Sequence, residues 1–399
     1  MFVRELALTD FRSWPQVELT LRPETTIFVG RNGFGKTNLL ESLFYLATLR
    51  SHRVSSDAPL VRSGASQAVV RAAVENEGRE LDVELTIAAQ GANKAKVNTS
   101  PVRRTREILG ILRAVLFAPE DLALVRGEPG ERRRFADEIV VQRRPMAAAS
   151  RADYDRVLRQ RAALLKTAGA AIRRSSAEAD SVMTTLDVWD DQLAQFSAEV
   201  TADRLAMVRE LNPLVAQAYS SIAPHSRPAE VLYRSAAGPE VDESDGGPDS
   251  VEAIREVLQA RLAEVRQKEI DRGVCLVGPH RDDLLLGLGD EPAKGFASHG
   301  ESWSLALALR LACVELLRAD GIEPVIMLDD VFAELDSARR QKLASFTAGA
   351  EQLLVTAAVG EDIPDEIRGR RVDVGTGEQD GQRCSVVLGD ALIGEGGES

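Results

Sequence analysis

The sequence predicts an α/β domain that is split in two by a mainly helical insertion. The first observation is a glycine-rich turn at residues 30–37, with a short apolar run before it and a helical pattern after it. A second apolar run, at residues 325–328, ends in two carboxylates. Between them lies a long stretch rich in Ala, Arg and Leu, a composition typical of helices. We therefore expect one α/β domain formed by residues 1–144 and 271–399, and a helical lobe at residues 145–270.

The composition is that of a chain that folds into two or three domains. It has 399 residues, of which 44% are hydrophobic. Cys275, Cys313 and Cys384 are odd in number and far apart, which leaves no disulfide framework and favours a reducing compartment. The N-terminus shows no apolar leader, and no run of 18 apolar residues occurs. We therefore expect a cytoplasmic protein that is neither secreted nor membrane-spanning.

The net charge of −13 argues against a nucleic-acid binder if it is taken alone, because phosphate binding depends on clustered Lys and Arg. The charge is unevenly distributed, however. Residues 131–174 contain twelve basic and five acidic residues, a local net charge of +7. The segment around Glu240, Asp242, Glu243 and Asp245 is acidic instead. A basic surface is therefore compatible with the composition.

Strand patterns dominate the first hundred residues. Alternating or short apolar runs predict strands at Phe2–Leu8, Val17–Leu21, Thr25–Val29, Val69–Val74 and Leu81–Ile87. Leucines at helical spacing predict a helix over Asn38–Leu49, directly after the glycine-rich turn. This region therefore contains a strand, a turn and a helix in that order.

The insertion is predicted to be helical in two parts. The first part runs from about Pro145 to Leu211. It is expected to break near Pro213 and Pro224–Pro228, and then at a loop over residues 236–250. A last helix is expected over Val251–Ile270. Strand patterns then return at Val274–Val277, Val325–Leu328, Leu353–Thr356 and Ser385–Leu388.

The glycine-rich turn satisfies the P-loop pattern in the strand-turn-helix context that the pattern requires. Its residues are Gly30, Arg31, Asn32, Gly33, Phe34, Gly35, Lys36 and Thr37. Glycines let successive backbone N–H groups point at phosphates, and the following helix adds its positive N-terminal end. We expect Lys36 to reach the β- and γ-phosphates of ATP and Thr37 to ligate Mg²⁺. The alternative is a chance glycine-rich turn, which this context disfavours.

The apolar run that ends in Asp329 and Asp330 looks like a Walker B strand. Asp329 would hold Mg²⁺ through water, and Asp330 would polarise the water that attacks the γ-phosphate. The alternative is that both carboxylates merely end a strand and cap the next helix. A buried parallel strand of this length is what a P-loop domain needs, so Asp330 and Lys36 are the predicted catalytic residues.

Two segments near this strand match ABC-type ATPases. Val331–Asp336 is similar to the D-loop that these ATPases place at their dimer interface. Ser298-His299-Gly300-Glu301 opens a helix predicted over Ser302–Arg318. Ser298 and Gly300 would contact the γ-phosphate bound by a second subunit, although Ser298 alone is equally consistent with an ordinary N-cap.

Other P-loop classes fit less well. A nucleotide kinase needs a pocket for a phosphoryl acceptor and has neither a signature helix nor a D-loop. An SMC-type scaffold carries a coiled coil of hundreds of residues, whereas the insertion at residues 145–270 is far shorter and sustains no heptad pattern. A transporter subunit would require a membrane partner.

Further short sequence motifs indicate one particular family of ABC-type ATPases. They are Phe11-Arg12-Ser13-Trp14, Gly33–Glu41, Ser51-His52-Arg53, Phe117–Leu122, Gly278–Asp283 and Leu328–Val331. In combination they resemble the RecF family of bacterial DNA-repair ATPases over nearly the whole chain. The resemblance implies a weak DNA-dependent ATPase, with ATP and Mg²⁺ as cofactors, that forms an ATP-dependent homodimer on single-stranded, gapped or double-stranded DNA. It also implies RecR and RecO as partners, support of RecA loading in recombinational repair and replication restart, and a place in the SOS response.

The sequence departs from typical ABC-type ATPases in two places. Glu301 brings a negative charge into the signature, where it must face away from phosphate or be paired. Thr356 stands where a switch histidine is usual, which leaves open how the attacking water is held. His280 and Arg281 suggest either a catalytic role or a turn whose charged side chains pair with each other. No His/Cys cluster has metal spacing, so ATP and Mg²⁺ are the only cofactors expected.

Arg132, Arg133 and Arg134 are candidate contacts to a DNA backbone. They open a basic stretch that continues with Arg143, Arg144, Arg151, Arg156, Arg159 and Arg161. The alternative is a solvated helical face whose cations pair with nearby Asp residues. Aromatic residues make up 5% of the chain, which argues against recognition by base stacking.

Overall fold

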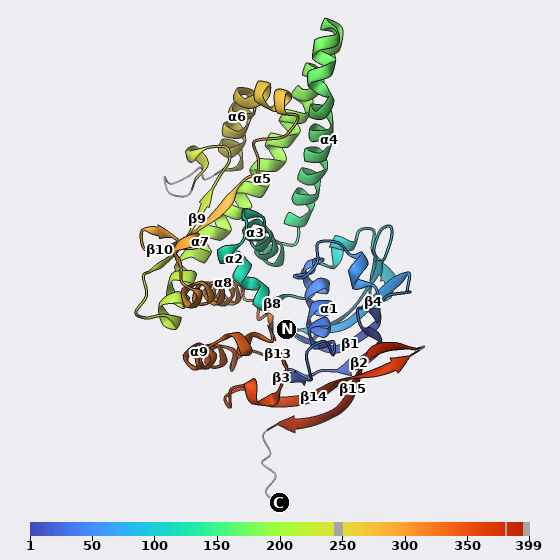
Figure 1. The fold of residues 1–399 in the computed structure, drawn as a ribbon. Coiled ribbons are helices and arrows are strands. Elements are labelled where there is room, and N and C mark those ends of the chain that lie inside the picture. Colours follow the sequence, from blue (N-terminus) through green and yellow to red (C-terminus); the bar gives the residue numbers. More distant parts are fainter. Residues whose placement is uncertain (243–249, 380, 394–399) are drawn as a thin grey trace, which may run out of the picture. The chain divides into compact units, whose positions relative to one another are not determined.

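The computed structural model describes residues 1–242, 250–379 and 381–393 (Figure 1). Residues 243–249, and with them Glu243 and Asp245 of the predicted acidic loop, lie outside the described residues. The chain forms two compact units, and each is assembled from separate segments. The first unit comprises residues 1–125, 217–226 and 298–399, and the second comprises residues 126–216 and 227–297. These boundaries differ from those predicted, because a helix at residues 129–143 and a strand at residues 283–288 pack against each other in the second unit.

The first unit contains a mainly parallel sheet. Its strands are β3 (Thr25–Val29), β8 (Ala114–Phe117), β12 (Val325–Asp329), β13 (Leu353–Ala357), β14 (Gly369–Gln379) and β15 (Gln382–Ile393). They follow the order β15-β14-β3-β13-β12-β8, in which β15 pairs antiparallel and the other pairs are parallel. The carboxyl ends of β3, β13 and β12 therefore meet at one edge, where open α/β sheets bind ligands.

An antiparallel sheet forms the second layer of this unit. Its strands are β1 (Phe2–Phe11), β2 (Trp14–Thr20), β4 (Gln67–Asn76), β5 (Arg79–Ala88), β6 (Lys94–Val97) and β7 (Ser100–Pro101). The order is β2-β1-β4-β5-β6-β7. Buried and exposed residues alternate along β1 and β2, as expected for a sheet with one face on a core and the other in solvent.

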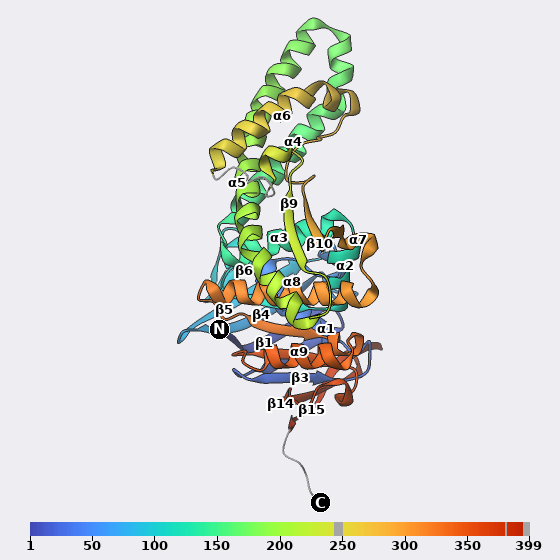
Figure 2. The ribbon, with the colours of Figure 1, turned by 90° about the vertical axis from the view of Figure 1, so that its left-hand side faces the viewer.

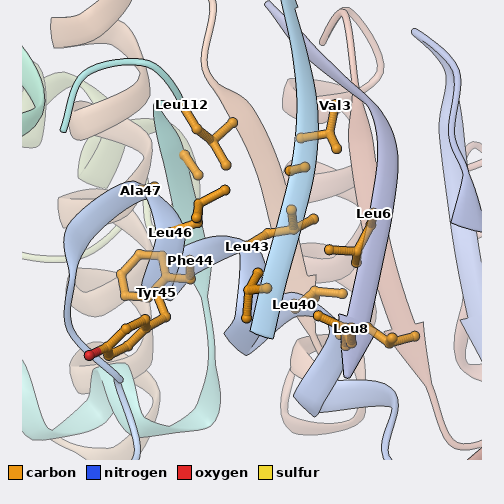
Figure 3. Close-up of a cluster of buried hydrophobic side chains, with 14 of the residues drawn as sticks. Val3, Leu6, Leu8, Leu40, Leu43, Phe44, Tyr45, Leu46, Ala47 and Leu112 are labelled. Atoms are coloured by element: carbon orange, nitrogen blue, oxygen red, sulfur yellow. The ribbon is translucent and has the colours of Figure 1, made fainter. Parts of the chain in front are cut away.

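Helix α1 (Lys36–Thr48) fills the space between the two sheets of the first unit. Every residue from Leu39 to Thr48 is buried, because the helix contacts strands of both sheets. Figure 3 shows Leu40 and Leu43 of α1 on the side of the helix toward the buried β1 residues Leu6 and Leu8. Shortening one such leucine to Ala costs about 2–5 kcal/mol, so this core fixes the helix that begins at Lys36.

Three further helices complete the first unit. They are α2 (Leu122–Arg126), which ends at the unit boundary, α8 (His299–Ala319) and α9 (Ser337–Thr347). Helix α8 contacts β8, and its Arg310 donates to Asp121 at 2.9 and 2.8 Å in a buried pair. This pair fixes α8 against the segment that follows β8.

The second unit is mainly helical. It contains α3 (Pro129–Arg143), α4 (Ala147–Arg174), most of α5 (Ser176–Ile222), α6 (Val251–Arg272) and α7 (Ala293–Phe296). A small sheet of β9 (Ala229–Arg234), β10 (Asp283–Leu288) and β11 (Glu291–Pro292) accompanies them. Figures 1 and 2 show α4 and α5 as an antiparallel hairpin with α6 alongside, and apolar residues of all three helices share one core.

Two predicted elements are wrong. Residues 274–277 form no strand, because the carbonyl of Cys275 accepts from Arg281 at 3.2 and 3.1 Å and the amide of Leu276 donates to Glu269 at 2.6 Å. Side chains thus supply the hydrogen bonds to this backbone that a neighbouring strand would supply in a sheet. Helix α5 also continues through Pro213. Burial of Val208, Leu211 and Val215 on either side offsets the roughly 3 kcal/mol that proline costs inside a helix.

Candidate nucleotide-binding site

The P-loop connects the end of β3 to the start of α1. Gly33 and Gly35 have φ values of +82° and +96°, a conformation that glycine adopts without strain. A Cβ atom at Gly35 would clash with Oγ of Ser385 and lie 2.7 Å from Oγ of Ser13. The carbonyl of Gly35 accepts a hydrogen bond from Trp14 Nε1 at 3.0 Å. The curl of the loop therefore depends on glycine, on the segment that joins β1 to β2, and on β15.

Lys36 is buried, with 3% of its surface exposed. Its Nζ donates to the carbonyl of Gly30 at 2.7 Å, approaches Oδ1 of Asn32 at 3.5 Å and lies 3.7 Å from Oδ2 of Asp330. The ammonium is thus directed back into the loop and toward the Walker B strand. A cation held in this way inside a curl of backbone suits a bound phosphate.

The two sequence-predicted acids meet the P-loop at the end of β12. Thr37 donates to Oδ1 of Asp329 at 2.9 Å, and Thr356 at the end of β13 donates to the same oxygen at 2.7 Å. Burial raises the pKa of Asp329 to about 6, and the two threonine hydrogen bonds oppose that rise. Asp329 is therefore mostly ionised at pH 7 and takes up a proton in mild acid, where the proton would compete with a bound cation.

Asp330 has a left-handed backbone, with φ of +48°, and its amide donates to the Thr356 hydroxyl at 2.9 Å. Burial raises the pKa of its carboxyl, and the charge of Lys36 opposes the rise. Its Oδ1 is buried and has no hydrogen-bond partner among the described residues. The position predicted for a switch histidine is therefore occupied by a threonine that links both acids.

His52 lies beside these acids, although the sequence singled it out only as part of a family string. Its side chain is 7% exposed, and its Nε2 lies 4.0 Å from Oδ2 of Asp329. Its ring packs edge-on against Phe44, with the ring centres 5.9 Å apart. Neither ring nitrogen has a hydrogen-bond partner in the described part of the chain. Burial lowers the pKa of His52 to about 4, so the imidazole is neutral at pH 7.

Glu41 of α1 anchors the segments around the P-loop. Arg12 donates to both of its carboxylate oxygens at 2.9 and 2.6 Å, and Ser51 donates at 2.5 Å. Burial opposes ionisation, but the hydrogen bonds from Arg12 and Ser51 outweigh it and lower the pKa of Glu41. Arg53 donates to Asn38 at 3.1 Å. Arg12 is thus a half-buried structural cation and not the solvated charge that its sequence context would suggest.

The signature residues cap α8. Ser298 is exposed, its Oγ accepts from the amide of Glu301 at 3.2 Å, and its own amide donates to Glu301 Oε2 at 2.9 Å. Ser226 also donates to Glu301 at 3.3 Å. Glu301 is therefore paired, as its charge requires, and Ser298 is an N-cap. Among the described residues, Ser298 and Gly300 make no hydrogen bond to residues 30–37.

The predicted D-loop is joined to the signature helix within the same unit. Asp336 caps α9 by accepting from the amide of Arg339 at 2.9 Å. Arg339 in turn donates from Nε to Ser304 Oγ of α8 at 2.8 Å, and a Cβ atom at Gly300 would lie 3.0 Å from its guanidinium. Gly300 thus leaves room for the arginine that connects the two helices.

The candidate DNA contacts Arg132, Arg133 and Arg134 do not form one exposed surface. Arg132 is 7% exposed and donates to both carboxylate oxygens of Asp283 at 2.8 Å. Arg133 donates to the carbonyl of Asp282 at 2.8 Å. Arg134 is exposed and pairs with Glu131. The prediction of a three-arginine DNA surface is corrected, because two of these side chains fix α3 to the start of β10.

His280 and Arg281 are held inside the second unit. His280 Nδ1 lies 2.6 Å from the hydroxyl of Tyr154, and Arg281 donates to Cys275 as described above. Burial lowers the pKa of His280 to about 4. The structure therefore shows a turn at this position, but its side chains bind Tyr154 and the Cys275 carbonyl and do not pair with each other as the sequence alternative expected.

A P-loop, a Walker B strand, a signature helix and a D-loop in this order define an ATPase head of the ABC and SMC class. A family model described as RecF/RecN/SMC N terminal domain matches residues 2–364. The DNA replication and repair protein RecF of Rhodococcus erythropolis (strain PR4 / NBRC 100887) is 57% identical over 396 residues, which cover 97% of each chain. The chain belongs to the RecF family.

Solved structures agree with this assignment. The recombination mediator protein RecF with ATP, described as part of the RecFOR pathway, is 25% identical, with a TM-score of 0.83 over 96% of this chain and 97% of that one. The Smc head domain of Pyrococcus furiosus is 16% identical, with a TM-score of 0.52 over 97% of this chain and 96% of that one, and shares the fold. The predicted fold class, an ABC-type head split by a mainly helical insertion, is confirmed. Within the described residues, none of the helices has the length and apolarity of a membrane span.

Proposed function

We propose that this protein is an ATP-dependent switch that closes as a homodimer on DNA during recombinational repair and replication restart. The observation that carries the proposal is the hydrogen bond from Thr37 to Asp329, which joins the P-loop to the Walker B strand. The relative in Rhodococcus erythropolis is a DNA replication and repair protein, and a solved RecF is described with ATP. Both support the same role for this chain.

The residues at the end of the parallel sheet fit ATP and Mg²⁺. Lys36 would hold the β- and γ-phosphates, while Thr37 and Asp329 would hold the metal. Oδ1 of Asp330 is buried and has no hydrogen-bond partner among the described residues, so a water molecule bound in the site would satisfy it. When bound, Mg²⁺ neutralises the charge on the phosphates. Asp330 orients the attacking water and accepts its proton at the carboxylate.

Ser298 and Gly300 act across a dimer interface in this proposal. The exposed Ser298, at the N-terminal end of α8, is suited to a γ-phosphate held by a second copy. Arg339 would transmit that contact to the D-loop, since it bonds both Ser304 and Asp336. ATP then favours the closed dimer only by its higher affinity for that state, and slow hydrolysis releases it.

The wider role follows from the family. We propose that the dimer binds single-stranded, gapped or double-stranded DNA, and that it works with RecR and RecO to load RecA. The name of the solved relative places that protein in the RecFOR pathway, which supports these partners here. The same reasoning supports weak, DNA-stimulated ATPase activity and a part in the SOS response to DNA damage.

The test uses an Asp330→Asn variant, which should bind ATP and fail to hydrolyse it. Light scattering with ATP and Mg²⁺ is expected to show a stable dimer. Adding Ser298→Arg should return the protein to a monomer, while the control Ser221→Arg, at another exposed serine, should leave the dimer intact. A monomer for Asp330→Asn at saturating ATP would overturn the switch mechanism. Stimulation of the wild-type ATPase by a nucleoside, with none by gapped DNA, would point to a kinase instead.

A further inference from the structure

Helix α4 carries positive charge on the face opposite to its core contacts. Its buried residues are Tyr154, Val157, Arg161, Leu165 and Ala168. At about 100° per residue, the other side of the helix presents Arg156, Arg159, Lys166 and Arg173 within an arc of roughly 100°. All four are exposed, and the exposed Ala163 and Ala170 lie between them. We call Arg156, Arg159, Lys166 and Arg173 the α4 stripe.

The charge of the α4 stripe is largely unneutralised. Residues 156–177 contain no Asp or Glu. Arg156 pairs with Asp153 at 3.2 Å, whereas no ion pair is formed by Arg159, Lys166 or Arg173 in the described part of the chain. The arginine on the opposite, buried face behaves differently, because Arg161 lies 2.6 Å from both Asp190 and Glu269.

Carboxylates on the neighbouring helices are already engaged. Asp191 of α5 pairs with Arg255 at 2.8 Å, and Asp187 pairs with Arg266 at 2.6 Å. In a chain with a net charge of −13, Arg159, Lys166 and Arg173 are a local exception, because they form no ion pair within the described residues. Arg159, Lys166 and Arg173 are exposed and seven residues apart, so they repel one another only weakly in water and are open to an anionic partner.

The dimensions and composition of the α4 stripe fit one kind of partner. Arg156 and Arg173 are about 26 Å apart along the helix axis, a length that spans about seven base pairs along the axis of B-DNA. The stripe has no aromatic residue for stacking on single-stranded bases. It also has no apolar anchor for a protein partner, and the apolar face that a membrane-bound helix would insert is buried in the core.

We infer that the α4 stripe is a contact surface for the sugar-phosphate backbone of duplex DNA, such as the double-stranded flank of a gap. The inference rests on the proposed DNA-binding function and assigns that function to a surface other than Arg132–Arg134. Contacts of this kind position DNA without reading its sequence.

The test replaces Arg159, Lys166 and Arg173 together by Gln. Duplex DNA binding is measured by titration at several salt concentrations, with the full-length chain and ATP. The slope of log K against log salt should become shallower by about two to three units, and affinity near 0.1 M salt should fall on the order of a hundredfold. Two duplexes of different sequence should be affected equally.

The matched control replaces Arg255, Arg261 and Lys268 of α6 by Gln, which changes the net charge by the same amount. Its salt slope is expected to equal that of the wild type, and ATP affinity should be unchanged in both variants. If the wild type binds duplex and the α4 variant keeps the wild-type slope, this inference is wrong while the proposed function stands. If the wild type binds no DNA at any salt concentration, both fail. Loss of binding to phosphatidylserine vesicles with unchanged DNA binding would overturn the inference in favour of a membrane surface.

Discussion

Nε2 of His52 lies 4.0 Å from Oδ2 of Asp329, yet neither nitrogen of this buried imidazole has a hydrogen-bond partner among the described residues. An unsatisfied buried polar group costs about 1–3 kcal/mol, so the position is unfavourable for the nucleotide-free protein. Water around a metal held by Thr37 and Asp329 would supply the missing partner. His52 is therefore suited to orient the metal site without touching phosphate.

Replacing His52 by Leu should separate the cost of burying an unsatisfied imidazole from the contribution of that imidazole to the metal site. We expect the free energy of unfolding of the nucleotide-free protein to rise by about 1 kcal/mol, because the unsatisfied nitrogens are removed. The affinity for ATP in the presence of Mg²⁺ should fall, whereas affinity without the metal should not change. Chemical unfolding and nucleotide titration measure the two quantities. His52→Gln is the control that keeps polar atoms, and equal Mg²⁺ dependence in all three proteins would contradict this role.

Replacing Arg132 by Ala should lower the free energy of unfolding, because the arginine is buried and paired. Removal of one partner from its buried, bidentate pair leaves the Asp283 carboxylate uncompensated, at a cost of about 3–5 kcal/mol. The exposed Arg134→Ala, two residues away, should stay within about 0.5 kcal/mol of the wild type. Urea unfolding compares the two variants. The double variant Arg132→Ala with Asp283→Ala should recover part of the loss, and similar stabilities for both single variants would refute the assignment.

Local patterns allowed much of the nucleotide site to be predicted. The P-loop, the Walker B strand and the signature helix each depend on neighbouring residues, so the sequence predicted β3, α1, β12 and α8 close to their observed bounds. Glycine at positions of positive φ and an apolar run before two acids carry that information directly. The capping box of Glu301 with Ser298 is also a local pattern, and it explains why a charged residue is tolerated in the signature.

Contacts between distant residues could not be predicted in the same way. Asp283, the partner of the buried Arg132, lies 151 positions further along the chain. The local sequence of the three arginines does not show that one of them pairs with so distant a carboxylate. The segment Val274–Val277 has the composition of a strand, but the side chains of Glu269 and Arg281 form hydrogen bonds with its backbone. The burial of His52 beside Asp329 depends on the packing of α1 between two sheets. These features belong to tertiary structure, which a single sequence does not encode locally.

The stability of the second unit should fall in mild acid because of His280. Its pKa in the folded protein is about 4, below the ordinary value of 6.5, so the unfolded chain binds a proton in this window and the native state does not. Stability is therefore complete above about pH 6.5 and is lost as pH falls toward 4. Between pH 7 and 5 the loss from this residue is at most about 2 kcal/mol.

His280→Gln should reduce that acid-dependent loss. Urea unfolding at pH 7 and pH 5 gives the change in the free energy of unfolding for each protein. Subtracting the change in the variant from that in the wild type cancels the contribution of the titrating carboxylates. The control is His225→Gln, at an exposed histidine, which should keep the wild-type dependence. His52, whose pKa is also lowered to about 4, should leave a residual dependence in the His280 variant. The prediction fails if His280→Gln and His225→Gln lose the same stability on acidification.

Thr356 should be essential to the metal site although it replaces a histidine. Its hydroxyl donates to Asp329 at 2.7 Å and accepts from the Asp330 amide at 2.9 Å, so one buried atom positions both acids. Valine has nearly the same shape and no hydroxyl. Thr356→Val is therefore expected to lower the free energy of unfolding by about 1–3 kcal/mol, because it leaves the Asp330 amide without its partner.

The same substitution should weaken Mg²⁺-dependent ATP binding, because the lost hydrogen bond opposed the burial that raises the pKa of Asp329. More of that carboxyl is then protonated near neutral pH, and a protonated carboxyl does not hold a metal ion. Raising the pH from 7 to 8 should restore much of the affinity in Thr356→Val and change the wild type little. Thr356→Ser, which keeps the hydroxyl and loses a methyl group, should bind as the wild type does. A valine variant that is less stable but binds Mg²⁺ and ATP normally at pH 7 would limit Thr356 to a structural role.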